Sequence, residues 1–440
     1  MGDRVRVALV AVGALLLGAC SHGIVDEQVP SNENDGDAIV KVPHSGTGNF
    51  MPPEKEEKPS TRPDIVANGG PLFRAAFDGT GATSLNSFDR YEAALQSDGT
   101  LTLATKKGVP GVDPQPTDYY GGSFYNGGSF RYASVVSPAW IPYDAFDTVT
   151  PSFEALTPPG TWIEVYVSAH VVATGEWTKD YSLGVWAHDA STVRRHSVSG
   201  QKDANGDVVT DRLELTSKAD ALHVSVMLFS ADATTTPSLR AVSAITSLTG
   251  AKVMKVEGDR TSWGKTLAVP KRAQADAAWS APTSTSMLLG FWGVKASPSD
   301  AAQLSSDVVQ GGPGNELFDT AFASSMANGD LHSMVTRLGS IAQLEPLVAK
   351  GIPVAIAVTY DDGELHGAPL SHVGGHVLVV KGFTATGAVV VNDPAFGTDE
   401  TVETTYDRAE LAAAFARAGG TAYVAWPQAV KLPADPLGAY

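Results

Sequence analysis

The sequence predicts an all-β sandwich of jelly-roll type followed by an α+β domain. Residues 72–250 contain short segments in which apolar and polar residues alternate, as in strands buried on one face. Residues 273–440 begin with a helical pattern and continue with short apolar runs. The chain has 440 residues, of which 43% are hydrophobic, so it is long enough for two or three domains with real cores.

Residues 1–20 have the pattern of a lipoprotein signal peptide. Arg4 and Arg6 precede an apolar run over residues 7–17, which is too short for a comfortable transmembrane helix. Small residues stand directly before Cys20, as in a bacterial lipobox, although an ordinary cleavage site beside a cysteine is the alternative. The sequence thus predicts an exported bacterial lipoprotein, held at a membrane by lipidated Cys20 and facing the cell exterior or the periplasm.

Composition predicts a tether before the folded part and argues against one class of partner. Residues 21–71 are rich in Pro, Asn, Glu, Lys, Ser and Gly without periodicity, which predicts a disordered tether. Cys20 is the only cysteine, so no intramolecular disulfide forms and no catalytic thiol is left once this residue is lipidated. The net charge of −17 offers no basic stripe for phosphates, which argues against a nucleic-acid partner.

The sandwich is predicted from strand-like segments between turns. Residues 162–167, 181–186 and 222–229 alternate with period two. Turn sequences such as Pro-Pro-Gly at residues 158–160 separate such segments. Many short strands without a long helical period are typical of a jelly roll.

A short duplication marks one edge of the predicted sandwich. Gly-Gly-Ser-Phe occurs at residues 121–124 and again at residues 127–130, with tyrosines interleaved at Tyr119, Tyr120, Tyr125 and Tyr132. One interpretation is an aromatic surface that contacts a glycan by stacking. The alternative is that these rings simply fill the sandwich, because aromatic residues are enriched in strands.

A junction at residues 251–272 precedes the α+β domain, which opens with a helix. Pro282 suits the first helical turn, and Gly293 suits the helix end. The apolar residues that share one face are Met287, Leu288, Phe291 and Trp292. Ser280 therefore lies at or just before the helix N-terminus, where the helix dipole and free N–H groups stabilise developing negative charge. Serine is also a favoured N-cap residue, so a purely structural cap is the alternative.

Three later segments predict successive buried strands at residues 353–358, 375–380 and 387–391. His376 stands at the start of the second segment, and Asp393 follows the third. Adjacent antiparallel strands would bring the two side chains together. The carboxylate would then hold the imidazole while the other ring nitrogen faces a nucleophile.

In combination these pieces resemble the bacterial peptidase C39-like family, which has a papain-like cysteine peptidase fold. The matching pieces all lie within residues 273–440 and are, in order, Trp279 to Ser284, Gly375 to Val380, Val390 to Pro394 and Tyr406 to Glu410. The resemblance implies an α+β papain-like domain that takes a peptide or protein as its substrate or ligand.

The resemblance also implies a triad that hydrolyses peptide or isopeptide bonds. It assigns the nucleophile to Ser280, the base to His376, the orienting acid to Asp393 and the oxyanion-stabilising amide to Gln274. Ser280 stands in place of the family's cysteine, and Ala281 in place of the serine that follows it. The alternative is therefore a pseudoenzyme, an inactive surface protein that binds or scaffolds with the same fold.

Three further residues are expected to line the substrate cleft: Trp279, Asn392 and His372. A metal site is the other interpretation of His366, His372 and His376, which lie close together in the sequence. These histidines precede a strand and not a helix on which a histidine pair would converge. We expect neither a metal nor a cofactor.

Overall fold

The computed structural model of the chain describes residues 40–41, 65–67, 70–104, 108–113, 127–232, 234–250, 256 and 258–440. The predicted signal peptide with Cys20 and nearly all of the predicted tether lie outside the described residues. So do the first Gly-Gly-Ser-Phe copy and three of the tyrosines beside it, Tyr119, Tyr120 and Tyr125. In the part that is described, no helix is both long and apolar enough to span a bilayer.

The first part of the chain is all-β, apart from two short 3₁₀ helices at Gly81–Thr83 and Leu85–Ser87. Its strands are β1 (Val40–Lys41), β2 (Ile65–Ala67), β3 (Leu72–Ala76), β4 (Asp89–Tyr91), β5 (Ala93–Leu95), β6 (Leu101–Leu103), β7 (Val109–Val112), β8 (Ser129–Val136), β9 (Ala139–Ile141), β10 (Phe146–Leu156), β11 (Thr161–Val171), β12 (Glu176–Trp177), β13 (Tyr181–Trp186), β14 (Gly206–Val209), β15 (Arg212–Ser230) and β16 (Ser238–Ser247).

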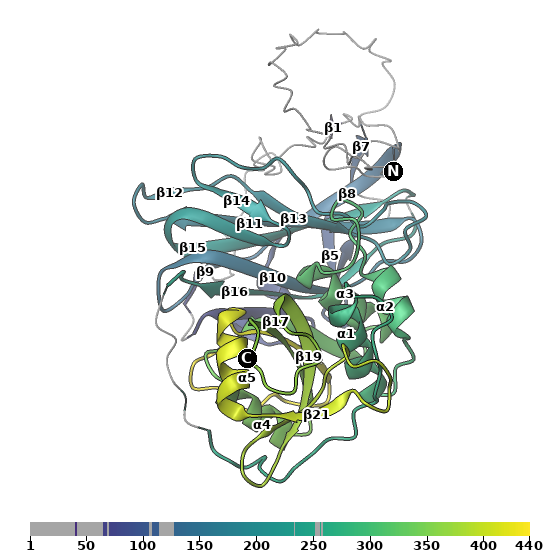
Figure 1. The fold of residues 1–440 in the computed structure, drawn as a ribbon. Coiled ribbons are helices and arrows are strands. Elements are labelled where there is room, and N and C mark those ends of the chain that lie inside the picture. The colour runs from purple at the N-terminus through teal and green to yellow at the C-terminus, as the bar shows by residue number, and fades with distance from the viewer. Residues whose placement is uncertain are drawn as a thin grey trace, which may run out of the picture. The chain divides into compact units, whose positions relative to one another are not determined.

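The long strand β15 joins two groups of strands into one sheet. Its residues 213–219 pair with β10, whereas residues 219–230 pair with β11 and residues 225–230 with β8. β16 flanks β10 on its other side and in turn pairs with β3 and β6. A strand that leaves one layer and enters another lets a sheet enclose its own core. The result is a single hydrogen-bonded sheet of 16 strands. Figure 1 labels its long strands β10, β11 and β15. The jelly-roll order stays a prediction.

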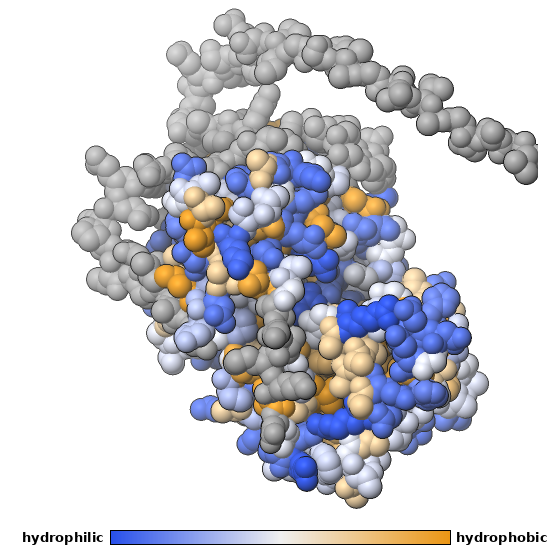
Figure 2. Space-filling model, turned by 60° about the vertical axis from the view of Figure 1, so that its left-hand side comes forward, coloured by the Kyte–Doolittle hydropathy of each residue, from blue (hydrophilic) through white to orange (hydrophobic). Residues whose placement is uncertain are grey.

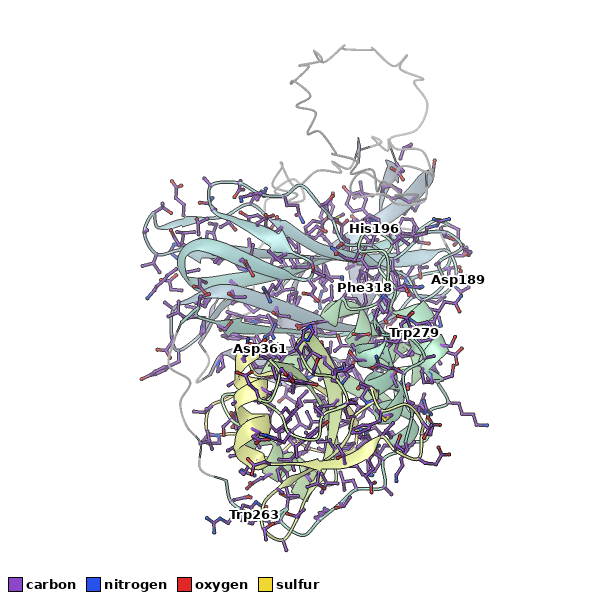
Figure 3. All side chains as sticks on the ribbon, in the orientation of Figure 1. Asp189, His196, Trp263, Trp279, Phe318 and Asp361 are labelled. Carbon is purple, nitrogen blue, oxygen red and sulfur yellow. The ribbon has the colours of Figure 1, made fainter. Side chains whose placement is uncertain are left out.

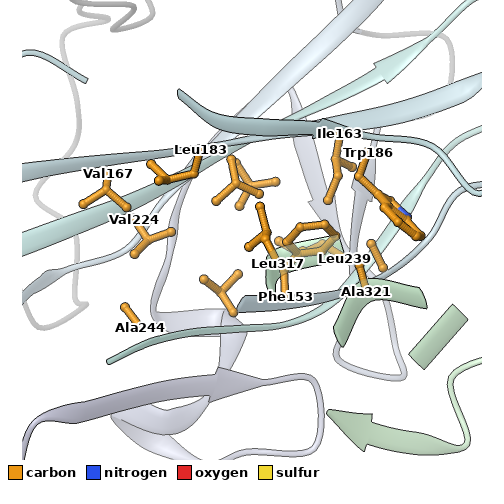
Figure 4. Packing of buried hydrophobic residues seen from close by; sticks show 14 of the residues in the cluster. Phe153, Ile163, Val167, Leu183, Trp186, Val224, Leu239, Ala244, Leu317 and Ala321 are labelled. Atoms are coloured by element: carbon orange, nitrogen blue, oxygen red, sulfur yellow. The ribbon is translucent and has the colours of Figure 1, made fainter. Parts of the chain in front are cut away.

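The strand pattern places side chains in two separate cores. In β11 the residues Ile163, Val165 and Val167 point into the main core, together with Leu317 and Ala321 of a later helix (Figure 4). Their neighbour Trp162 lies in a second cluster on the opposite face, stacked on Phe229 with 5.2 Å between ring centroids. Strands predicted to be buried on one face are therefore buried on both faces here.

That second cluster bears on the predicted glycan contact. Phe130 and Tyr132, which come from the second Gly-Gly-Ser-Phe copy and its surroundings, are both buried and pack with Trp162 and Phe229. They fill the sandwich, as the alternative interpretation expected, because their strand turns this face toward other aromatic rings. On the face drawn in Figure 2, hydrophobic residues form separate patches among hydrophilic ones.

The second part of the chain is α+β. Its helices are α1 (Ser280–Phe291), α2 (Pro298–Leu304), α3 (Glu316–Met326), α4 (Leu344–Ala349) and α5 (Arg408–Arg417), with a 3₁₀ helix at Ile341–Gln343. Its strands are β17 (Leu331–Arg337), β18 (Val354–Tyr360), β19 (Val373–Phe383), β20 (Val389–Asn392), β21 (Glu403–Tyr406) and β22 (Thr421–Pro427). They form a six-stranded antiparallel sheet in the order β17-β22-β18-β19-β20-β21. The helical pattern thus comes before most of the strands, as predicted.

Helix α1 differs from the predicted amphipathic helix because it has almost no exposed face. Its residues 280–289 are all buried. Met287 and Leu288 pack in the core of the six-stranded sheet, while Leu289 packs in the core that the β-sandwich shares with α3. A helix between two cores needs apolar or hydrogen-bonded residues all round.

A buried ion pair connects the two parts. Glu154 of β10 accepts hydrogen bonds from Arg74 of β3 (2.5 Å) and from the backbone N–H of Ser333, and its other oxygen lies 3.0 Å from His332 Nδ1 of β17. Burial raises the pKa of Glu154, but the charges of Arg74 and His332 outweigh it and hold the pKa below the ordinary value.

Part of the predicted junction belongs to the second sheet. Trp263 and Thr266 form bridges to Phe383 and Gly382 at the end of β19. The indole N–H of Trp263 also donates to the buried Glu345 (2.9 Å). These bonds satisfy backbone and indole groups that a free linker would leave to water. This attachment leads the chain directly to the start of α1.

Candidate active site

Ser280 is the first residue of α1 and lies beside β19. The N-cap position belongs to Trp279, which makes no side-chain cap; Figure 3 labels this residue beside the helix. The Oγ atom of Ser280 accepts a hydrogen bond from the backbone N–H of Val377 (3.3 Å). The structural alternative, in which Ser280 caps its own helix, is therefore wrong. The hydroxyl turns toward the neighbouring strand because the helix start packs against it.

The structure brings His376 and Asp393 together. His376 lies near the start of β19, Asp393 directly follows β20, and the two strands are antiparallel neighbours. The Nε2 atom of His376 is 2.7 Å from Oδ1 of Asp393. Only 3% of the histidine surface and none of the aspartate surface is exposed. A carboxylate in this position fixes the ring orientation and the tautomer of the imidazole.

Asp393 is held by three donors. Oδ1 accepts from His376 and from the backbone N–H of Ala395 (3.0 Å), and Oδ2 accepts from the hydroxyl of Tyr406 (2.7 Å). Burial raises the pKa of this carboxyl, but the bonds from His376 and Tyr406 and the charge of His376 outweigh it, so the pKa lies below the ordinary value. Asp393 is therefore the ionised partner of the pair.

The serine and the histidine are close neighbours that share no hydrogen bond. The donor to Ser280 is the N–H of Val377, the residue after His376. Among the described residues, nothing forms a hydrogen bond with Nδ1 of His376, which leaves this nitrogen for a proton transfer. Catalytic hydrogen bonds are often long in unliganded enzymes and tighten when substrate binds. The arrangement has the parts of a nucleophile, a base and an orienting acid.

Gln274 lies next to this group, tethered by its backbone. Its N–H donates to the carbonyl oxygen of Pro394 (2.8 Å), directly after Asp393. Its side-chain Nε2 donates to Ala277 (3.2 Å), while Oε1 is buried without a partner among the described residues. An amide nitrogen carries two hydrogens, and only one of those of Gln274 is bonded among the described residues.

The residues expected to line a cleft differ in exposure. Trp279 is half-buried and His372 is exposed. Asn392 is fully buried, and its amide donates to the backbone carbonyl oxygens of Val269 (3.4 Å) and Pro270 (3.0 Å). The expectation that Asn392 lines the cleft is therefore corrected, since its side chain holds the segment that leads to Gln274.

Replacing Asn392 with alanine is expected to lower the free energy of unfolding by about 1–3 kcal/mol, because the buried carbonyl group of Val269 and the partly buried one of Pro270 lose their donor. Urea denaturation measures this change. The control is Asn86→Ala, since Asn86 is exposed and its side chain accepts a hydrogen bond from Arg90 at the surface. Equal effects of the two substitutions would contradict the anchoring role.

The other histidines do not gather into a metal site. His366 is exposed and pairs with Glu410 of α5 (2.6 Å), and the ring of His372 lies 3.3 Å from the Ser371 hydroxyl. Within the described ranges, no group of three or more His, Cys, Asp or Glu side chains is arranged to hold a metal ion.

Comparison with known families now adds to this geometry. Residues 266–423 match the model of the family described as "Peptidase_C39 like family". Residues 80–247 match a second model, described as "Peptidase C39 N-terminal domain". The chain contains a peptidase C39-like domain. Ser280, His376, Asp393 and Gln274 all lie within it, and the all-β part corresponds to the N-terminal domain that the second family describes.

Solved structures are less similar to this chain. A double glycine motif protease from an AMS/PCAT transporter, in complex with the leader peptide, is 19% identical over 37% of this chain and 94% of its own, with a TM-score of 0.25. A family two carbohydrate esterase from Cellvibrio japonicus is 14% identical over 50% of each chain, with a TM-score of 0.17. None of the curated proteins matches.

Sequence reasoning missed two contacts of the peptidase C39-like site. Tyr406 was noted only as part of a family motif, although it bonds to Asp393. Ser284, one turn after Ser280, donates to the carbonyl oxygen of Val377 (2.9 Å) and pins α1 to β19. Its spacing of four residues from Ser280 is the signal that places both hydroxyls on one face of the helix.

Proposed function

We propose that this protein is an exported, lipid-anchored hydrolase of peptide or isopeptide bonds, with Ser280, His376 and Asp393 as its triad. The observation that carries the proposal is the buried His376–Asp393 pair, with the start of α1 bonded to the next residue, Val377. The packing of α1 against β19 supports a papain-like arrangement of helix and sheet. Export and anchoring rest on the pattern of residues 1–20 and on Cys20.

In the proposed reaction His376 Nδ1 takes the proton of Ser280 Oγ as this oxygen attacks the substrate carbonyl carbon. The negative charge moves to the carbonyl oxygen, where the backbone N–H groups at the start of α1 and the free amide hydrogen of Gln274 stabilise it. When the C–N bond breaks, the imidazolium gives its proton to the leaving amine. Water then repeats the attack on the acyl-serine ester and restores Ser280.

A second candidate function is a binding or scaffolding protein with the same fold. The specific observation in its favour is that Ser280 Oγ bonds to the Val377 N–H, with no hydrogen bond to His376 among the described residues. A hydroxyl ionises far less readily than the family's thiol and depends on its base during attack. A serine that does not engage the base would leave the fold intact and the chemistry slow.

Hydrolysis of a broad peptide library by the purified protein tests the proposal. Wild-type turnover is expected to vanish in Ser280→Ala and to fall by about 10²-fold or more in His376→Ala, because the base is then lost. The matched control is His366→Ala, an exposed histidine that pairs with Glu410, which should retain activity. Wild-type turnover that survives Ser280→Ala would refute the triad, and no turnover at all would favour the binding protein.

A further inference from the structure

The family-like segment from Tyr406 to Glu410 contributes several distinct contacts. Asp407 caps α5 by accepting from the N–H groups of Ala409 and Glu410. Arg408 forms an ion pair with the buried Glu345 (2.6 Å), and Glu410 pairs with His366. These contacts stabilise the fold. Only Tyr406 bonds to a residue of the proposed triad, Asp393 (2.7 Å).

We propose that Tyr406 is a positioning residue that keeps the Asp393 carboxylate oriented toward His376. This inference rests on the proposed triad, which it extends by one member. Tyr406 ends β21, Asp393 follows the neighbouring strand β20, and Tyr406 pairs in register with Val389. This register places Tyr406 at the end of β20 that is away from Asp393, and its long side chain donates to Oδ2, the oxygen that the imidazole does not bond.

The two oxygens of Asp393 have different donors, which gives Tyr406 its role. Oδ1 is shared by His376 and the backbone of Ala395, whereas Oδ2 has Tyr406 as its only donor among the described residues. Without that hydroxyl, a fully buried carboxylate oxygen would be left without a partner. The carboxyl would then rotate, or hold a proton, and in either case its bond to the imidazole would weaken.

Tyr406 is suited to donate at every physiological pH. Burial, reinforced by the charge of Asp393 and by the hydrogen bond between them, raises the pKa of its hydroxyl far above the ordinary value. Tyr360 provides a comparison, because it is also buried and its pKa is raised to about 12, by burial and by Asp393. The Tyr360 hydroxyl has no hydrogen-bond partner in the described part of the chain. Two phenols thus lie near one carboxylate, and only one is bonded to it.

NMR titration of His376 in the full chain tests this role without depending on hydrolysis. In Tyr406→Phe the Asp393 carboxyl turns away from the imidazole or holds a proton, so it stabilises the imidazolium less. The apparent pKa of His376 is therefore expected to fall by about half a unit or more. Tyr360→Phe is the matched control and should leave that pKa unchanged. Equal shifts in the two variants would overturn the proposal.

Two further measurements separate positioning from general stability. In an Asp393→Asn background, Tyr406→Phe should no longer shift the pKa of His376, since the effect passes through the carboxylate. A shift that persists there would contradict the proposal. If Tyr406→Phe does not fold, 3-fluorotyrosine at position 406 keeps the ring and donates more strongly to Oδ2, so the carboxylate stays in place and the pKa of His376 should not fall; a fall in that variant would contradict the proposal.

Hydrolysis kinetics give the link to the proposed function. Where turnover is measurable, Tyr406→Phe is expected to lower kcat with KM unchanged, because a substrate-binding contact is not removed. A KM effect alone would argue for a substrate contact instead. Absence of turnover in every variant would reject the proposed hydrolase. The NMR titration of His376 would still decide the positioning role of Tyr406, because it does not depend on turnover.

Discussion

Replacing Ser280 with cysteine is expected to raise the rate of peptide hydrolysis by about 10²-fold or more. A hydroxyl gives up its proton only to its base during attack, and Ser280 shares no hydrogen bond with His376 among the described residues, so its attack requires His376 to move into contact first. A thiol ionises in part at neutral pH and is a strong nucleophile, so it relies less on that contact. The rest of the site, from His376 to Asp393, is already assembled.

The measurement is kcat/KM on the peptides that the wild type turns over fastest, or on the whole library if it turns over none. A full chain with Cys20→Ser provides the background, since Cys20 is the only natural cysteine. The matched control is Ser284→Cys, which places a buried thiol on the same helix, one turn away, against the Val377 carbonyl. Activity in both variants would point to unspecific thiol chemistry, and activity in neither would show that the cleft no longer binds substrate productively.

The site residues on the last strands were accessible to sequence reasoning because their pattern is local. A buried strand that is followed by Asp393, next to another that has His376 near its start, leaves little freedom in how the two side chains approach each other. The structure has that strand pair and a distance of 2.7 Å between the side chains. Short apolar runs bounded by polar residues were therefore enough to predict that His376 and Asp393 lie side by side.

Contacts between distant parts of the chain were not accessible in this way. Glu154 and His332 are far apart in the sequence. No periodic pattern in either segment predicts that the buried carboxylate on β10 contacts the histidine on β17. The amphipathic pattern assigned to α1 failed for the same reason, since Leu289 is covered by the core of the β-sandwich. Tertiary packing, not local propensity, decides which faces are buried.

Buried acids are a further consequence of this packing that sequence alone does not show. Asp319 lies in α3, between the two parts of the chain, and none of its surface is exposed. Burial raises its pKa to about 7, with a contribution from Glu316, although the nearby Ser305 hydroxyl, whose hydrogen bond goes to Ala301, opposes the shift. In the unfolded chain the same carboxyl titrates near its ordinary value of about 3.9.

This difference makes stability fall as the pH rises, and Asp319→Asn is expected to remove that fall. Below the unfolded pKa both states hold the proton. Between the two pKa values only the folded state does, so the free energy of unfolding decreases with pH until it passes about 7. From pH 5 to pH 8 the loss is about 3 kcal/mol, at 1.36 kcal/mol per pKa unit.

Guanidinium denaturation at pH 5 and pH 8 gives the change in the free energy of unfolding for the wild type and for Asp319→Asn. Subtracting one change from the other cancels the contributions of all other titratable groups. Asp362→Asn, at an exposed aspartate, is the control and should leave the wild-type slope unchanged. Asp180 is an internal standard, because burial raises its pKa to about 6, so Asp180→Asn should remove a smaller part of the slope. Parallel slopes for the wild type and Asp319→Asn would mean that Asp319 is ionised in the folded protein.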